Sequence, residues 1–163
     1  MLNSYDKSIE SYKDYPVQTA SHNSVVGSKQ PYHLEQKPMQ VLLIEDSALL
    51  REAIMEVLSH AKLNFKHVAT TQLDAIALLD KEAFDFIIVD IELAQGNGFE
   101  VIKHVMRPDY AFTPPIAMIL TNHAHPHYRQ RAKDLGVKYF FDKSMDFDSA
   151  IETVEEEAAK FTS

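Results

Sequence analysis

The chain has 163 residues, 45% of them hydrophobic, and a formal net charge of −8 at pH 7. This length supports one substantial hydrophobic core and leaves little room for two domains. The chain has no cysteine, which excludes disulfides and thiolate metal sites, and its acidic balance argues against direct binding to nucleic-acid phosphates.

Residues 1–38 differ in composition from the rest of the chain. They are rich in Ser, Gln, Asn, Tyr and His, show no sustained apolar periodicity, and carry four lysines against four acidic residues. This composition predicts a disordered or loosely docked N-terminal extension. No basic segment precedes an apolar run, and no apolar stretch approaches the ~20 residues of a membrane span. We therefore expect a cytoplasmic protein that does not insert into membranes.

From Met39 onward, short apolar runs alternate with amphipathic stretches, a pattern typical of repeated strand–helix units. Five runs are predicted as strands because most are too short and too rich in β-branched or aromatic residues for helices. They cover residues 40–44, 64–69, 84–89, 116–120 and 138–141. Three of them are nearly wholly apolar, which indicates burial on both faces of a parallel sheet that is covered by helices.

The segments between these strands are predicted as helices. Ser47 can cap a helix over 48–60, and Thr71 with Asp74 forms a capping-box pattern before the second helix. Further helices are expected at 98–105, 128–135 and 147–161, with Gly136 at a helix C-terminus. In the last helix, Ile151, Val154, Ala158 and Phe161 form one apolar stripe, and residues 155–157 are expected mostly to face water.

Five such units with right-handed crossovers predict a doubly wound α/β sheet, which binds ligands beyond the carboxyl ends of its strands. Polar residues stand at four of those ends: Glu45, Asp46, Asp90, Thr121 and Lys143. Three converging carboxylates repel one another, and a hard cation such as Mg²⁺ relieves that repulsion. A lysine and a hydroxyl beside the ion suit a transferred phosphoryl group, with a carboxylate as the nucleophile.

Four blocks of the sequence resemble the signature blocks of response-regulator receiver domains. They are residues 43–47 (LIEDS), 87–90 (IIVD), 120–121 (LT) and 140–143 (FFDK). The spacings agree as well, with 44 residues from Asp46 to Asp90, 31 from Asp90 to Thr121 and 22 from Thr121 to Lys143. The resemblance implies a receiver domain over residues 39–163. Its sheet would be flavodoxin-like, with strand order 2-1-3-4-5 and helices on both faces.

The resemblance also implies chemistry. Asp90 corresponds to the residue that accepts a phosphoryl group from a sensor histidine kinase or a histidine phosphotransfer protein. Asp46 corresponds to a direct Mg²⁺ ligand and Glu45 to the acidic residue that reaches the ion through water. The backbone carbonyl of Glu92 would complete the metal site.

Three further residues resemble the family's phosphoryl-binding and switch positions. Lys143 corresponds to the lysine that pairs with the phosphoryl oxygens, and Thr121 to the hydroxyl residue that moves toward the phosphate. Phe140 corresponds to the aromatic switch position. Phosphorylation is therefore expected to change the affinity of the face made by the fourth helix, the fifth strand and the fifth helix.

The sequence departs from the family pattern at several positions. Ser144 replaces the usual proline after the lysine, and Asn122 is larger than the usual small residue after the switch hydroxyl. We expect Asn122 to slow exchange with small phosphodonors. Glu92, Asn122 and His123 occupy positions that tune dephosphorylation in this family.

The motif His123-Ala-His125-Pro-His127 is interpreted as a polar loop. Alternating histidines are potential metal ligands, but no carboxylate or cysteine close in the sequence completes a coordination shell.

No output module is expected after the last helix, so the chain is interpreted as a stand-alone, non-enzymatic response regulator. It is expected to be a monomer or a phosphorylation-dependent dimer and to signal by contacting an effector protein. An aspartate-dependent phosphatase is disfavoured because Asp-x-Asp does not end the first strand. The alternative that stays open is a receiver-like interaction module that works without phosphorylation, because Asn122 and Ser144 depart from the family pattern.

Overall fold

The fold comes from a computed structural model of the chain, which describes residues 35–163. Most of the extension predicted at residues 1–38 therefore lies outside the described residues. Residues 35–38 are exposed and have no regular secondary structure, and the first strand begins at Met39.

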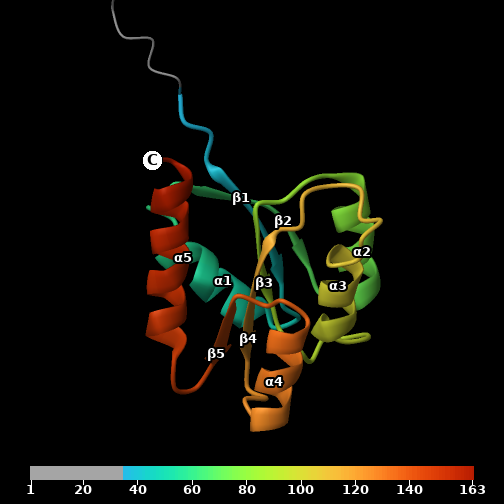
Figure 1. The fold of residues 1–163 in the computed structure, drawn as a ribbon. Helices are drawn as coiled ribbons and strands as arrows, with labels where there is room; N and C mark the ends of the chain where they lie inside the picture. The colour runs from blue at the N-terminus through green and yellow to red at the C-terminus, as the bar shows by residue number, and fades with distance from the viewer. Residues whose placement is uncertain (1–34) are drawn as a thin grey trace, which may run out of the picture. The chain divides into compact units, whose positions relative to one another are not determined.

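Strands and helices alternate along the described chain (Figure 1). The strands are β1 (Met39–Ile44), β2 (Leu63–Ala69), β3 (Phe86–Val89), β4 (Ile116–Thr121) and β5 (Tyr139–Asp142). The helices are α1 (Ala48–Val57), α2 (Gln72–Lys81), α3 (Gly98–Val105), α4 (Pro126–Asp134) and α5 (Phe147–Phe161). All strand pairs are parallel, and the sheet order is β2-β1-β3-β4-β5, which confirms the predicted doubly wound α/β fold.

Helices cover both faces of the sheet, as the apolar strands predicted. Alternate residues of β1 point to opposite sides: Val41 and Leu43 pack with α1 and α5, whereas Leu42 and Ile44 pack with α2, α3 and α4. All four side chains are fully buried. The sheet is therefore the shared middle layer of two hydrophobic cores, which holds the carboxyl ends of β1, β3, β4 and β5 side by side.

Several ends differ from the prediction for local reasons. Helix α1 ends at Val57 rather than at residue 60, because the chain then tightens into turns that bond three residues back. Strand β3 begins at Phe86, two residues later than predicted, and the Asp85 carboxylate before it accepts a hydrogen bond from the backbone N–H of Gln40 at 2.7 Å. Helix α4 begins two residues early because Pro126 fits the first helical position.

The predicted helix end at Gly136 is confirmed. Gly136 has a φ of 86°, its N–H bonds to the Lys133 carbonyl, and the Val137 N–H bonds to the Ala132 carbonyl. This pair of bonds is a Schellman motif, which requires the left-handed conformation that glycine adopts without strain.

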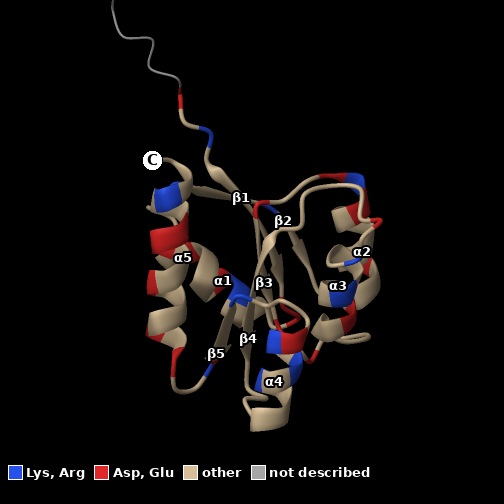
Figure 2. Cartoon of the chain, viewed as in Figure 1, with Lys and Arg blue, Asp and Glu red and all other residues tan. Residues whose placement is uncertain are grey.

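The charges of the two helices that flank β5 are opposite in sign (Figure 2). Helix α5 carries five acidic residues and one lysine, whereas α4 carries three basic residues and one aspartate. No helix in residues 35–163 is long and apolar enough to cross a membrane.

The predicted faces of α5 are partly wrong. Phe161 is 46% exposed, whereas Glu157, expected among the mostly exposed glutamates, is only 6% exposed. The Glu157 carboxylate accepts a hydrogen bond from the Tyr139 hydroxyl at 2.5 Å and one from the Lys138 ammonium at 3.0 Å. These two donors on and beside β5 explain how a carboxylate is tolerated at the sheet surface.

Glu157→Gln should lower the free energy of unfolding by about 1–2 kcal/mol near neutral pH, because it weakens two hydrogen bonds to a buried charged acceptor. The Tyr139 hydroxyl and then Lys138 lower the pKa of Glu157 below its ordinary value of 4.5. The stabilisation is therefore present above that value and is lost as the pH falls through the lower native pKa. Urea denaturation should show the difference from the wild type shrinking on acidification below about pH 4.5.

The exposed neighbour Glu156 provides the control. Glu156→Gln should change stability by no more than about 0.5 kcal/mol. Equal effects of the two substitutions at neutral pH would show that the Glu157 contacts do not stabilise α5 on the sheet.

Candidate functional site

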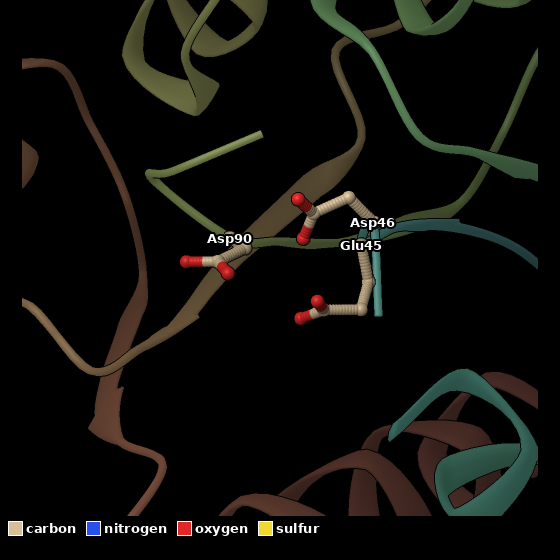
Figure 3. A group of neighbouring side chains, drawn as sticks. All are labelled: Glu45, Asp46 and Asp90. Atoms are coloured by element: carbon tan, nitrogen blue, oxygen red, sulfur yellow. The ribbon is translucent and has the colours of Figure 1, made fainter. Parts of the chain in front are cut away.

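The carboxyl ends of β1, β3, β4 and β5 bring the predicted polar residues to one edge of the sheet. Glu45, Asp46 and Asp90 each offer a carboxylate oxygen, and these oxygens all lie within 4.8 Å of one another. Figure 3 shows the three carboxylates turned toward a shared space. Asp46 is exposed, whereas Glu45 and Asp90 are only 3% and 7% exposed. The donor set consists of carboxylate oxygens, which fits a hard divalent cation such as Mg²⁺.

Lys143, which follows β5, is the positive charge of this site. Its ammonium group lies 2.6 Å from Glu45 Oε2 and 2.6 Å from Asp90 Oδ2, and its side chain is 11% exposed. One cation therefore pairs with two buried carboxylates that come from different strands.

The pKa values of Glu45 and Lys143 are both raised, for different reasons. Burial raises the pKa of the Glu45 carboxyl, against the opposing hydrogen bonds from Lys143 and the Ser47 N–H, and the charge of Asp90 raises it further. Burial alone would lower the pKa of Lys143, but the hydrogen bonds and charges of Asp90 and Glu45 raise it above its ordinary value. Burial is thus the main cause for Glu45, whereas the two neighbouring carboxylates are the cause for Lys143.

Two contacts that the sequence did not predict hold Glu45 in place. The Ser47 N–H donates to Glu45 Oε1 at 2.9 Å, and the Arg51 guanidinium donates to the Glu45 backbone carbonyl at 2.8 Å. Arg51 lies one helical turn beyond the Ser47 cap. A basic residue at this spacing after the pair Glu45-Asp46 is the sequence signal that could have predicted the Arg51 contact.

Gly98 has a role beyond that of a turn residue. A Cβ atom at this position would lie 2.2 Å from the Asp90 carbonyl oxygen, and the Gly98 N–H bonds to the Ile91 carbonyl at 2.9 Å. Only glycine permits this approach, which places the start of α3 directly against the end of β3.

Thr121 ends β4 at the site and is fully buried. Its hydroxyl oxygen accepts a hydrogen bond from the His123 N–H at 3.2 Å, and its carbonyl accepts one from the Lys143 N–H at 2.9 Å. The residue predicted to bind the phosphoryl group thus connects the β4–α4 loop to the loop that carries Lys143.

Glu92 and His123 lie together beside the acceptor strand. His123 Nε2 is 2.5 Å from Glu92 Oε2, and with Ile91, Asn97 and Tyr128 they line part of a shallow surface pocket. The interpretation of the histidine motif overlooked this carboxylate because it lies 31 residues away in the sequence. Within residues 35–163, the three side chains close enough together to hold a metal ion are Glu45, Asp46 and Asp90, and no histidine belongs to that group.

His125 and His127 contact each other through their Nδ1 atoms. His125 also caps α4 by accepting the His127 N–H. The motif therefore serves partly as the start of a helix, which agrees with its interpretation as a polar loop segment.

Phe140 is half-buried on β5, and the guanidinium carbon of Arg129 lies 4.7 Å from its ring centroid.

Ser144 follows Lys143 in place of the usual proline. Both its N–H and its hydroxyl donate to Asp142 Oδ1, at 2.8 and 2.6 Å. These bonds lower the pKa of Asp142 and organise the loop that holds Lys143. Asn122 is exposed, and its expected effect on phosphodonor access stays a prediction.

Comparison with known proteins agrees with this geometry. A family model described as the response regulator receiver domain matches residues 41–155. The chain belongs to this family. Its members are signalling domains that bind Mg²⁺ at an acidic pocket and interact with histidine kinases and effectors.

Individual relatives are similar at modest identity. The transcriptional regulatory protein DegU of Brevibacillus brevis is 26% identical over 125 residues, which cover 74% of this chain and 50% of DegU. The chain thus spans half the length of that relative. The crystal structure of chemotaxis protein CheY4 of Vibrio cholerae matches with a TM-score of 0.61 and 27% identity, covering 73% of this chain and 98% of CheY4. The Mn²⁺-bound response regulator Rcp1 has the same fold, with a TM-score of 0.63 at 21% identity, covering 77% of this chain and 95% of Rcp1.

Asp46→Asn should weaken divalent-cation binding, because it removes the exposed carboxylate from the acidic cluster while leaving the Lys143 ion pairs in place. The loss should be at least the roughly 10–100-fold that accompanies loss of an outer-shell partner. Titration with Mn²⁺, followed by electron paramagnetic resonance, measures the affinity directly.

Asp74→Asn on α2 is the matched control, because Asp74 is exposed and lies outside the cluster. Equal Mn²⁺ affinities of the wild type, Asp46→Asn and Asp74→Asn would exclude the acidic cluster as the cation site.

Proposed function

We propose that this chain is a single-domain response regulator whose Asp90 accepts a phosphoryl group in a Mg²⁺-dependent reaction. One observation carries the proposal: the nearly buried Asp90 carboxylate contacts the Lys143 ammonium and belongs to the same cluster as the carboxylates of Glu45 and Asp46. A nucleophilic oxygen, a cation for the phosphoryl oxygens and a set of metal ligands are therefore present at one point.

The donor would be a phosphohistidine on a histidine kinase or a histidine phosphotransfer protein. An oxygen of Asp90 attacks the phosphorus, the new P–O bond forms as the P–N bond breaks, and the imidazole leaves with the electron pair and takes up a proton. When bound by Asp46, Glu45, Asp90 and the Glu92 carbonyl, Mg²⁺ would neutralise charge on the phosphoryl oxygens.

The residues around Asp90 then act as the switch. The acyl phosphate adds about −1.5 to −2 charge and several acceptor oxygens. Lys143 already contacts Asp90 and can follow the new charge, whereas the buried Thr121 hydroxyl must turn from the His123 N–H toward it. Because Phe140 lies on β5 and Lys143 directly follows that strand, the change would be transmitted to the surface between α4 and α5.

Exposed apolar side chains at this edge of the sheet support docking of a protein partner. Leu49 is 80% exposed at the start of α1, and Met145 is 81% exposed in the loop after β5. Both follow strands that end in the acidic site. We propose that the phosphodonor contacts them and that the phosphorylated protein passes the signal to an effector, as a monomer or as a phosphorylation-dependent dimer.

Wild-type protein incubated with acetyl phosphate and Mg²⁺ should acquire one phosphoryl group, and Asp90→Ala should acquire none. The expected readout is a retarded band in a phosphate-affinity gel, supported by intact-protein mass spectrometry. A chelator should abolish the modification because the acidic cluster would lose its cation.

Asp109→Asn, on the exposed segment between α3 and β4, is the matched control and should be modified as the wild type is. Absence of the modification in the wild type, together with no binding of beryllium fluoride, would contradict the proposal. It would favour a receiver-like interaction module that works without phosphorylation.

We further propose that the contact between Glu92 and His123 limits the approach of water to phosphorylated Asp90. Glu92 lies two residues after the acceptor, and its N–H donates to Asp90 Oδ1 at 3.3 Å. His123 lies two residues after Thr121, and their contact joins the loops that follow β3 and β4. A side-chain bridge at this position would screen the acyl phosphate from one side.

Glu92→Ala and His123→Ala should each shorten the lifetime of the phosphorylated protein severalfold, and the double variant should show no larger effect than either single variant. The reason is that both changes break the same contact, so their effects are not additive. The measurement is loss of the phosphorylated band after removal of acetyl phosphate. Fully additive effects, or a longer lifetime in both single variants, would contradict a shared screening role.

A further inference from the structure

Arg129 connects the segments on either side of the switch. Its Nε donates to the Ala124 carbonyl at 3.3 Å in the β4–α4 loop, and its Nη1 donates to the Phe140 carbonyl at 3.4 Å on β5. Its Nη2 lies 3.9 Å from Asp146 Oδ2, in the loop before α5. A single guanidinium on α4 therefore reaches three segments that come from different parts of the fold.

The same guanidinium lies over the Phe140 ring, with its central carbon 4.7 Å from the ring centroid. A cation at this distance is attracted to the face of an aromatic ring. Arg129 thus contacts both the backbone and the side chain of the residue at the aromatic switch position. A rotation of the ring away from this position would give up the cation–π contact.

The contacted segments each carry a residue of the proposed phosphorylation site. Ala124 lies three residues after Thr121, Phe140 lies three residues before Lys143, and Asp146 lies three residues after it. Each partner of Arg129 is therefore joined to Thr121 or Lys143 by a short length of backbone. The hydrogen bonds are long and the side chain is 44% exposed, so each contact is weak and the set can be exchanged for another.

We propose that Arg129 is a positioning residue that holds Phe140 and the β4–α4 loop in the resting arrangement and so sets the switch equilibrium. This inference rests on the proposed phosphorylation of Asp90, because it assigns a resting and an activated arrangement to that site. Arg129 acts through Phe140 and does not contact the reacting atoms. Weakening its contacts should raise the population of the activated arrangement in the unphosphorylated protein.

Arg129→Lys is the informative substitution. Lysine keeps the positive charge, but its single ammonium group lacks the planar fork that lets arginine bond two carbonyls and lie on a ring. An exposed cation–π contact of this kind corresponds to roughly a two- to fivefold change in population. The apparent affinity for a ligand of the activated arrangement should rise by the same factor.

Arg131→Lys is the matched control on the same helix. The Arg131 guanidinium lies 4.4 Å from the Phe99 ring centroid and 3.5 Å from a Glu100 carboxylate oxygen, both on α3. It has the same chemistry as Arg129 but contacts α3 in place of β5. Arg131→Lys should leave the ring of Phe140 and the ligand affinity unchanged.

The test uses the full chain with 4-fluorophenylalanine introduced at position 140 and followed by ¹⁹F NMR. The wild-type resonance without ligand and with Mg²⁺ and beryllium fluoride defines the resting and activated positions. In Arg129→Lys the ligand-free resonance should move toward the activated position, and beryllium fluoride should bind roughly two- to fivefold more tightly.

The outcomes separate the two proposals. A wild-type resonance that does not respond to Mg²⁺ and beryllium fluoride contradicts the proposed function. A wild-type resonance that responds, with Arg129→Lys identical to it in ligand-free position and in affinity, overturns the role of Arg129. The spectra without ligand test Arg129 whether or not the wild type responds to beryllium fluoride. Identical ligand-free ¹⁹F spectra of the wild type and Arg129→Lys would show that Arg129 does not hold the Phe140 ring.

Discussion

One lysine pairs with two buried carboxylates at the carboxyl edge of the sheet, and the rest of the site depends on this shortage of positive charge. Lys143 contacts Glu45 and Asp90 at 2.6 Å each, and Asp46 adds a third carboxylate to the same cluster. Burying charges is costly unless they are paired, and here the pairing is incomplete. Burial raises the pKa of Glu45 and the two carboxylates raise the pKa of Lys143, and the three clustered carboxylates suit the site to a further cation.

The fold makes this arrangement possible because its stability lies elsewhere. Two hydrophobic cores, one on each face of the sheet, hold β1, β3, β4 and β5 in parallel register, so that residues distant in the sequence end at one edge. Backbone hydrogen bonds across that edge, such as those from the Asp90 N–H to Ile44 and from the Lys143 N–H to Thr121, then fix the polar residues. The cores therefore offset the cost of a repulsive acidic cluster.

The features that the sequence predicted are those that depend on strand order and periodicity. Glu45, Asp90, Thr121 and Lys143 were identifiable because each ends or follows an apolar strand, and parallel strands end at one edge. The missed features depend on side-chain conformations between distant segments. Glu92 meets His123 across two loops, and Glu157 is buried only because the Tyr139 and Lys138 donors stand opposite it. Periodicity within α5 contains no information about donors on β5.

A few polar side chains link the segments around the site. The Lys143 ammonium is divided between Glu45 and Asp90, the Thr121 hydroxyl is paired with the His123 N–H, and the Arg129 guanidinium is divided among three segments. The exposed contacts of Arg129 are weak, whereas the buried ion pairs of Lys143 are stronger. A phosphoryl group on Asp90 would bring about −1.5 to −2 charge into reach of Lys143 and Thr121. If Asp90 is phosphorylated as proposed, Lys143 and Thr121 can exchange their present partners for phosphoryl oxygens by side-chain movements at the edge of the sheet, outside the two hydrophobic cores.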